Sequence, residues 1–185
     1  MDFFESKNIA RGSFNETKLD DGFFVLTYQN NGNETQTLQR EIDSSFIQFH
    51  YCIKGSSEFI FNNGNYRLKI EEENSLLLYN PQRDLPIYLE VHSKSWLVTV
   101  LVSIKKFHGL FSQEADYITF LSVDNKDKKY YKDGKISPSM AIALNQIINF
   151  NLNSSIKTLY FKGKALELLS LYFNRSEDAD IEQCP

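Results

Sequence analysis

The spacing of apolar residues changes near residue 105 of this 185-residue chain. Before that point, apolar residues alternate with polar ones in short runs that end in turn-forming residues, which is the period-two pattern of strands. After that point they recur every three to four residues, which is the spacing of amphipathic helices. A strand-rich block followed by helices constrains the fold more than any single residue does.

Short strand patterns run from residue 22 to residue 104. Ser45–Lys54 is the strongest, because it alternates strictly and places His50 and Cys52 on one face. Neither of its faces is strongly polar, so both are predicted to be partly buried. The other predicted strands are Gly22–Gln29, Gln36–Ile42, Glu58–Phe61, Tyr66–Ile70, Ser75–Tyr79, Leu85–Val91 and Trp96–Ile104. About eight short strands at this spacing indicate an antiparallel barrel or sandwich.

Two polar segments flank this block. Residues 1–20 are polar and irregular, and we interpret them as an arm that lies over the body of the protein. Leu121–Gly134 is rich in charge and is predicted to be a solvated loop. Asn63-Gly64 lies inside the block and is a strong signal for a hairpin turn.

Helical patterns occupy the rest of the second half. Ser103–Phe111 is predicted to be a short helix, and Ser137 followed by Pro138 gives the N-cap and first position of a second one. Ser155–Asn174 is predicted to be the last and longest helix, and it carries two apolar stripes. The first stripe is Leu159, Gly163, Leu166 and Phe173, and the second is Phe161, Ala165, Leu168 and Tyr172.

These two stripes face nearly opposite ways, because positions two apart are ~200° apart around a helix. An ordinary surface helix needs only one apolar face. Either the helix is enclosed within its own chain, or one stripe packs on the chain and the other meets a second subunit. The spacing alone does not choose between the stripes as the dimer interface.

The composition excludes some classes of protein. The net charge is −4, whereas a domain that binds DNA or RNA through phosphates carries a basic surplus. Cys52 and Cys184 are far apart and give neither a disulfide framework nor a zinc-binding spacing. The first 20 residues hold no apolar run of signal-peptide length, and no stretch approaches the ~20 apolar residues of a membrane span. We therefore expect a cytoplasmic protein without membrane contact.

Several short motifs follow one another in a specific order between residues 22 and 174. They are Ile-Lys-Gly-Ser at residues 53–56, the glycine hairpin, NSLLLYNPQ, LVSIKKFHGLF, the Ser-Pro-capped helix and KGKALELLSLYF. Together they resemble the N-terminal domain of AraC/XylS-type transcription regulators. The KALELLSLYF helix looks most like the subgroup related to siderophore-responsive regulators.

The resemblance implies a fold that is mainly β with α: a metal-free, cupin-like or jelly-roll antiparallel β-barrel followed by a C-terminal helical hairpin. It divides the chain into an arm at 1–20, the barrel at 21–105, a helical dimerisation subdomain at 106–174 and the start of a linker at 175–185. In such regulators the linker leads to two DNA-binding helix-turn-helix motifs, which this chain lacks. We expect a homodimer that senses a small-molecule effector and reaches DNA only through the missing domain.

The histidines do not form a cupin metal site. A metal-binding cupin needs a His-x-His pair, but here His50 is followed two positions later by Cys52. His92 and His108 fall in a predicted turn and a predicted helix, so spacing provides no third ligand. We expect hydrogen bonds to satisfy His50 beside a buried thiol, with no metal, no cofactor and no catalytic residue.

A binding pocket inside the barrel is the remaining candidate site, because a barrel of this size holds one small ligand. The candidate lining residues are Gln48, His50, Phe59, Phe61, Tyr66, Tyr79 and Trp96. The alternative is that these side chains simply fill the barrel. Two other functions stay open: a metal-free cupin enzyme such as a sugar isomerase, which needs an acid–base pair inside the barrel, and a carbohydrate-binding jelly roll, which needs exposed aromatic side chains.

Overall fold

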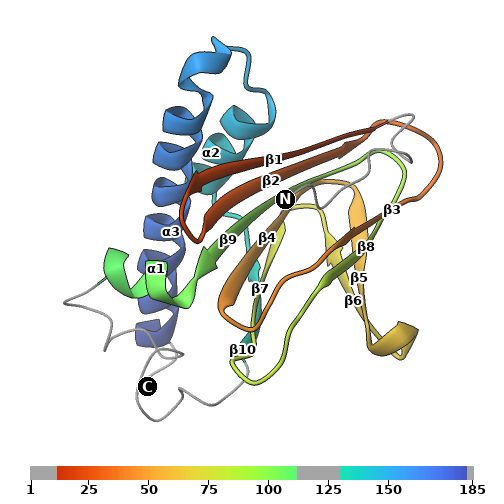
Figure 1. Cartoon of the computed structure of the whole chain (residues 1–185), viewed down its shortest axis with the longest axis horizontal. Helices are drawn as coiled ribbons and strands as arrows, with labels where there is room; N and C mark the ends of the chain where they lie inside the picture. Colours follow the sequence, from red (N-terminus) through yellow and green to blue (C-terminus); the bar gives the residue numbers. More distant parts are fainter. Residues whose placement is uncertain (1–11, 112–129, 183–185) are drawn as a thin grey trace.

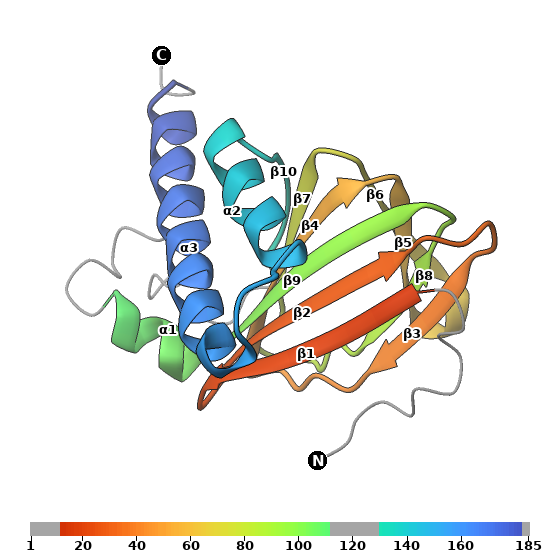
Figure 2. The same ribbon diagram turned by 90° about the horizontal axis from the view of Figure 1, so that it is seen from above.

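Two antiparallel sheets face each other, and three helices cover the outer side of the larger sheet (Figures 1 and 2). The computed structural model describes residues 12–111 and 130–182. Sheet A has the strand order β1-β2-β9-β4-β7-β10, and sheet B has the order β3-β8-β5-β6. None of the described helices is long and apolar enough to cross a membrane.

Most strands begin and end close to the positions that the alternating apolar patterns and the turn residues between them predict. Those of sheet A are β1 (Gly12–Asp20), β2 (Phe23–Asn30), β4 (Phe46–Lys54), β7 (Asn74–Tyr79), β9 (Ser95–Ser103) and β10 (Tyr130–Lys135). Those of sheet B are β3 (Gln36–Arg40), β5 (Ser56–Phe61), β6 (Tyr66–Glu71) and β8 (Ile87–Val91). A 3-10 turn, η2 (Asn62–Gly64), closes the β5–β6 hairpin. The helices are α1 (Ile104–Leu110), α2 (Pro138–Ile148) and α3 (Lys157–Glu182), and the 3-10 turn η6 (Ser154–Ile156) precedes α3.

Sheet A separates two hydrophobic cores. In β4, Ile47, Phe49 and Tyr51 point toward the helices and are buried in what we call the helix-side core. Cys52 points the other way, between the two sheets, into what we call the inner core. Sheet B closes the inner core with Phe59, Leu89 and other buried residues of its inward face. Because strand side chains alternate between faces, one set of strands supplies both cores.

The helices start where the sequence provides caps. The Ser103 hydroxyl accepts a hydrogen bond of 3.1 Å from Lys106 N at the start of α1, and the Ser137 hydroxyl accepts one of 3.2 Å from Met140 N at the start of α2. Each cap satisfies a backbone N–H that the first turn leaves without an intrahelical partner. Pro138 occupies the first turn of α2, where its missing N–H costs nothing.

Ion pairs tie the helices to the edge of sheet A. The Asp20 carboxylate, at the end of β1, lies 2.6 Å from Lys106 Nζ in α1 and 3.4 Å from Lys162 Nζ in α3. The hydrogen bond from Lys106 lowers the pKa of Asp20 to about 2, so the carboxylate stays charged at neutral pH. This contact joins three elements that are far apart in the sequence.

The predicted order of strands and helices is confirmed. The eight strands expected between residues 22 and 104 are β2 to β9, with ends that differ from the prediction by at most two residues. The three predicted helices are also present, and α2 packs against α3 as a hairpin. The prediction of a mainly β, cupin-like fold followed by helices is therefore confirmed.

Two polar segments were predicted wrongly. The irregular arm expected over residues 1–20 is a strand from Gly12 onward, and Tyr130–Lys135, within and just beyond the expected loop, forms β10. Both are edge strands of sheet A, paired with β2 and with β7 respectively. An edge strand is held by backbone hydrogen bonds to one neighbour, so it needs little apolar patterning. Residues 1–11 and 112–129 lie outside the described part of the chain.

The two stripes of α3 have different surroundings. The second stripe, including Phe161 and Leu168, is buried in the helix-side core. In the first stripe only Leu159 and Gly163 are exposed, because Leu166 and Phe173 pack partly against the same core. From the sequence the two stripes could not be distinguished. In the structure, the helix-side core covers the second stripe and half of the first. The helix also continues to Glu182, through the residues expected to begin a linker.

We predict that Leu168→Ala destabilises the protein by about 2–5 kcal/mol, because it opens a cavity in a close-packed core. Leu168 has an exposed fraction of 0%. Leu159→Ala on the same helix is the matched control, since Leu159 is 75% exposed, and it should change stability by less than about 0.5 kcal/mol. Urea unfolding of both variants measures the difference. Equal losses would show that α3 does not pack as described.

Candidate functional site

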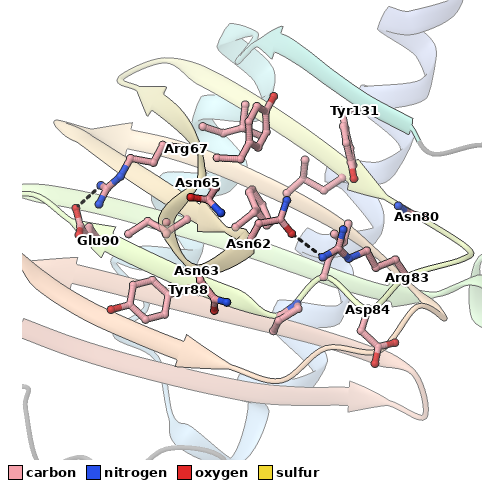
Figure 3. Close-up of a pocket in the computed structure, with 18 residues that line it drawn as sticks. Asn62, Asn63, Asn65, Arg67, Asn80, Arg83, Asp84, Tyr88, Glu90 and Tyr131 are labelled. Carbon is pink, nitrogen blue, oxygen red and sulfur yellow. Dashed lines mark hydrogen bonds and ion pairs between the residues drawn. The ribbon is translucent and has the colours of Figure 1, made fainter.

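A cleft of about 1170 Å³ lies where the β5–β6 hairpin meets the loop between β7 and β8 (Figure 3). Its walls come from η2, β6, β8 and the loop residues from Asn80 to Pro86, and Tyr131 of β10 reaches it from sheet A. Phe61, Leu78 and Leu85 supply apolar surface. The volume is somewhat above the roughly 300–1,000 Å³ of typical small-molecule sites, so the cleft has room for such a ligand.

Asparagine and tyrosine dominate the polar lining of the cleft. Tyr66, Tyr88 and Tyr131 are each partly exposed, and they present aromatic rings that end in hydroxyl groups. The asparagines of the lining are Asn62, Asn63, Asn65 and Asn80. Amides offer both donors and acceptors, and exposed rings offer stacking surfaces. The cleft therefore suits a ligand that combines a flat or apolar body with several hydrogen-bonding groups.

Local backbone geometry explains the asparagines of the hairpin tip. Asn62 and Asn63 have φ of 52° and 54°, in the left-handed region that asparagine tolerates better than most residues. Arg83 Nη2 donates a hydrogen bond of 2.5 Å to Asn62 Oδ1. This bond fastens the β7–β8 loop to the hairpin tip across the cleft, as Figure 3 shows.

A buried polar relay of Gln48, His50 and Thr99 runs beneath the cleft. Gln48 Nε2 donates a hydrogen bond of 2.7 Å to the carbonyl oxygen of Leu85, a cleft residue, so Gln48 Oε1 is left to accept. His50 Nε2 lies 2.9 Å from that Oε1, and His50 Nδ1 lies 2.6 Å from the Thr99 hydroxyl. Every group has a partner when His50 carries its proton on Nε2 and accepts from Thr99 at Nδ1.

Burial keeps this relay electrically neutral. His50 is fully buried and packs against Phe59, with ring centroids 4.4 Å apart and the ring planes inclined at 52°. The loss of water around it lowers the pKa of His50 from 6.5 to about 3. Burial likewise raises the pKa of the Cys52 thiol to about 12. Both ring nitrogens of His50 are engaged and the thiol stays protonated, so this pair offers no free metal ligand or nucleophile.

The structure brings some of the predicted pocket residues together and separates others. Gln48, His50 and Phe59 lie in or beside the inner core, and Phe61 and Tyr66 line the cleft above it. Tyr79 lies in the helix-side core, because Leu76 and Leu78 take the inward positions of β7. Trp96 shares the face of Val98 rather than that of Leu97, and its ring nitrogen donates to Asn31 Oδ1 at 2.8 Å.

Most of the cleft was not predicted from the sequence. Its unpredicted residues include Arg83, the asparagines of η2 and Tyr131. One signal of the cleft was present in the sequence. Three of the four residues at 62–65 are asparagine, which is more than a two-residue hairpin turn requires. No comparable signal marks Arg83 or Tyr131, which depend on the meeting of distant segments.

The fold defines a class of protein: a cupin-like domain of two antiparallel sheets with a helical hairpin on the back of its larger sheet. Residues 11–183 match the family described as the regulatory protein PchR N-terminal domain. Because this match covers nearly the whole chain, the chain belongs to that family of AraC-type regulator domains. The resemblance drawn from the sequence motifs is therefore confirmed. No curated protein sequence matches the chain.

Solved structures are similar to this chain at low sequence identity, and the one whose TM-score reaches 0.50 shares its fold. Ligand-free ToxT K231A from Vibrio cholerae is 16% identical with a TM-score of 0.50, over 83% of this chain and 56% of that one. Wild-type Vibrio cholerae ToxT with bound unsaturated fatty acid is 15% identical with a TM-score of 0.49, over 88% and 57%. A cupin protein from Desulfovibrio desulfuricans is 10% identical with a TM-score of 0.39, over 50% and 82%. The chain thus spans about half the length of the ToxT chains.

We predict that His50 makes the protein less stable in acid. The unfolded chain binds a proton at this histidine below pH 6.5, whereas the folded protein binds it only near pH 3, so the free energy of unfolding falls as the pH drops through this window. Between pH 7.5 and pH 5, the wild type should lose about 2 kcal/mol more than His50→Gln. Urea unfolding at both pH values measures this difference.

The control for this experiment is His108→Gln, which removes an exposed histidine of α1. The stability of this variant should fall with pH as that of the wild type does, because the predicted loss of stability in acid comes from the buried His50. An unchanged dependence in His50→Gln would contradict the assignment of His50 as a neutral, buried relay residue.

Proposed function

We propose that a small-molecule effector binds in the cleft and that sheet A transmits its presence to the helices. The observation that carries this proposal is the hydrogen bond from Gln48 to the Leu85 carbonyl, which ties the cleft lining to the central strands of sheet A. The three relay residues lie on β4 and β9. A shift of the β7–β8 loop is therefore coupled, through this hydrogen bond, to the relay and to these two strands.

The helices lie directly behind those strands. Phe49, between Gln48 and His50 in β4, points to the other face, and its ring centroid lies 5.3 Å from that of Tyr172 and 6.1 Å from that of Phe173 in α3. A close-packed core transmits displacement rather than absorbing it. An effector that binds one arrangement of the relay better than another therefore shifts the position of α3.

We further propose that the full-length protein is a cytoplasmic homodimer that reaches DNA through a separate domain. The exposed part of the first stripe, Leu159 and Gly163, supports dimerisation through α3, since a Cβ added at Gly163 meets nothing within 4 Å. Ile142 and Leu152 are also exposed, and they line a groove of about 490 Å³ between α2 and the start of α3. An exposed apolar patch is typical of an interaction site, and two-fold pairing is the commonest way to cover one.

Enzymatic activity is not part of the proposal. In the described inner core, His50 is neutral and engaged on both nitrogens, and Cys52 is protonated, so neither is poised for acid–base or nucleophilic work. A sugar isomerase would need such a pair. Carbohydrate binding is the second candidate function, and the partly exposed rings of Tyr66, Tyr88 and Tyr131 in the cleft favour it.

We predict that effectors raise the melting temperature of the wild type but not of cleft variants. A screen of small metabolites by thermal shift, repeated on Tyr66→Ala and Arg83→Ala, should identify compounds that need both side chains. Lys69→Ala is the matched control, because Lys69 lies on β6 outside the cleft and pairs with Glu71. A stabilising compound that acts equally on all four proteins binds elsewhere.

The same screen separates the two candidate functions. If simple sugars alone stabilise the protein, and if they leave the expression of a reporter under the full-length regulator unchanged, carbohydrate binding replaces effector sensing. A compound that both stabilises the domain and changes the reporter supports the proposal.

We predict that Leu159→Glu converts a dimer into a folded monomer, because it places a charge at the centre of the proposed interface. Sedimentation velocity at roughly tens of micromolar protein measures this change, since dimerisation depends on concentration. Leu110→Glu, at an exposed leucine of α1, is the control and should leave the assembly intact. A wild type that sediments as a monomer would refute dimerisation through this domain.

A further inference from the structure

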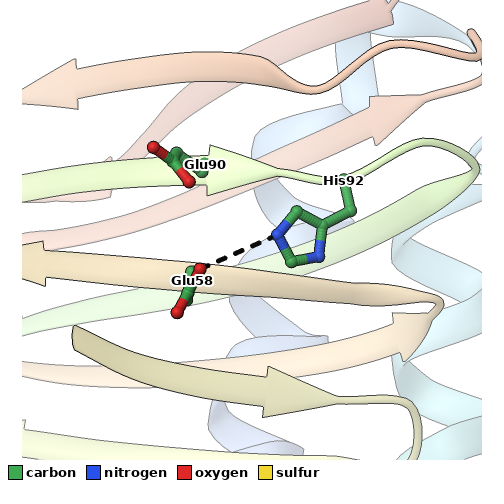
Figure 4. A group of neighbouring side chains, drawn as sticks. All are labelled: Glu58, Glu90 and His92. Carbon is green, nitrogen blue, oxygen red and sulfur yellow. Dashed lines mark ion pairs between the residues drawn. The ribbon is translucent and has the colours of Figure 1, made fainter.

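Three side chains of types that can ligate a metal meet on the outer face of sheet B, away from the inner core. Glu58 of β5 and Glu90 of β8 are direct cross-strand partners, and His92 follows two residues after Glu90 on the same face (Figure 4). One carboxylate oxygen of each glutamate and one imidazole nitrogen all lie within 4.8 Å of one another. Glu58 and Glu90 are held by the pairing of β5 with β8. His92 directly follows β8, which ends at Val91, and its backbone N–H donates to the carbonyl oxygen of Ser56 at the start of β5.

The imidazole is positioned before any ligand arrives. Asn30 is fully buried, and its Nδ2 donates to the carbonyl oxygens of Val91 and His92 at 3.0 Å each. His92 N donates to the carbonyl oxygen of Ser56 at 3.3 Å, and His92 Nδ1 lies 2.7 Å from the Ser56 hydroxyl. These contacts leave Nε2 facing Glu58, 4.0 Å from its Oε2. A partner on the second nitrogen is what orients a metal-binding histidine.

The charges at this site are incompletely balanced. Two carboxylates directly opposite each other on neighbouring strands repel. Arg67 Nη1 lies 3.3 Å from Glu58 and 3.2 Å from Glu90, so one guanidinium faces two carboxylates and one negative charge is left within this group. The Arg67 side chain is 44% exposed and is therefore free to turn into solvent. The site can exchange this cation for one of higher charge.

We propose that Glu58, Glu90 and His92 bind a divalent transition-metal ion, with Zn²⁺ as the best fit. One imidazole and two carboxylates form a nitrogen–oxygen donor set that zinc accepts, and three protein ligands leave a coordination position open. Zinc holds such ligands at about 2.0–2.2 Å, so the partly exposed side chains close inward by rotamer changes while Arg67 leaves. The site adjoins the cleft, because Glu90 and Arg67 also line the cleft, but zinc binding requires no effector.

The test is calorimetric titration of ZnCl₂ into the tag-free protein at pH 7.5, after removal of metal by EDTA and dialysis. We expect saturable binding of one ion per chain. His92→Gln and Glu58→Gln should each weaken binding by about 10-fold or more, because each removes one of three ligands. The matched controls are His108→Gln and Glu71→Gln, which change exposed residues outside the site and should bind as the wild type does.

Arg67→Gln distinguishes a metal site from a simple ion-pair network. If the guanidinium competes with the metal for the two carboxylates, its removal should strengthen zinc binding several-fold. If the cluster is only a salt-bridge network, the same variant gains no affinity for zinc. Circular dichroism of each variant shows that it is folded. The proposal is overturned if the wild type shows no saturable zinc binding, or if His92→Gln and Glu58→Gln bind as tightly as the wild type.

Discussion

The structure depends on one constraint, the strict alternation of side chains along β4 and β9, both of whose faces are buried. Phe49 must fit against α3 while its neighbours Gln48 and His50 must fit between the sheets. A slip of one residue would exchange the two sets and would place the polar relay against the helices. The pairing of these strands therefore fixes both cores together, and it places the helices opposite the relay beneath the cleft.

Most of the fold could be predicted from the sequence, because its strongest signals are local. The alternation of Ser45–Lys54 and the caps at Ser103 and Ser137 act within a few residues, and the structure has these elements as predicted. The edge strands β1 and β10 could not be predicted in this way. Their stability comes from backbone hydrogen bonds to β2 and β7, which leave no apolar pattern in the edge strand itself, and in the case of β10 the paired strand is also distant in sequence.

The candidate site was less predictable, because it depends on the register between strands. Leu78 pairs with Gln48, so Leu78 faces the inner core and Tyr79 faces the helices. Nothing within the NSLLLYNPQ motif shows which of these neighbours faces inward. The group on sheet B is a further example, since Glu58 and Glu90 become neighbours only through the pairing of β5 with β8. The expectation of a metal-free protein rested on the histidine spacing of the barrel strand and did not consider this face.

The cleft is built from a hairpin tip and a loop, and this has a consequence for evolution. Asn62, Asn63 and Arg83 belong to neither hydrophobic core, so substitutions there change recognition without opening a cavity in a core, although the positive φ at Asn62 and Asn63 favours asparagine or glycine. The packed residues of sheet A, in contrast, serve two cores at once and tolerate few changes. Related domains can therefore diverge in what they recognise while keeping the same route from cleft to helices. We expect sequence variation among them to be greatest at the tip of the β5–β6 hairpin and least along β4 and β9.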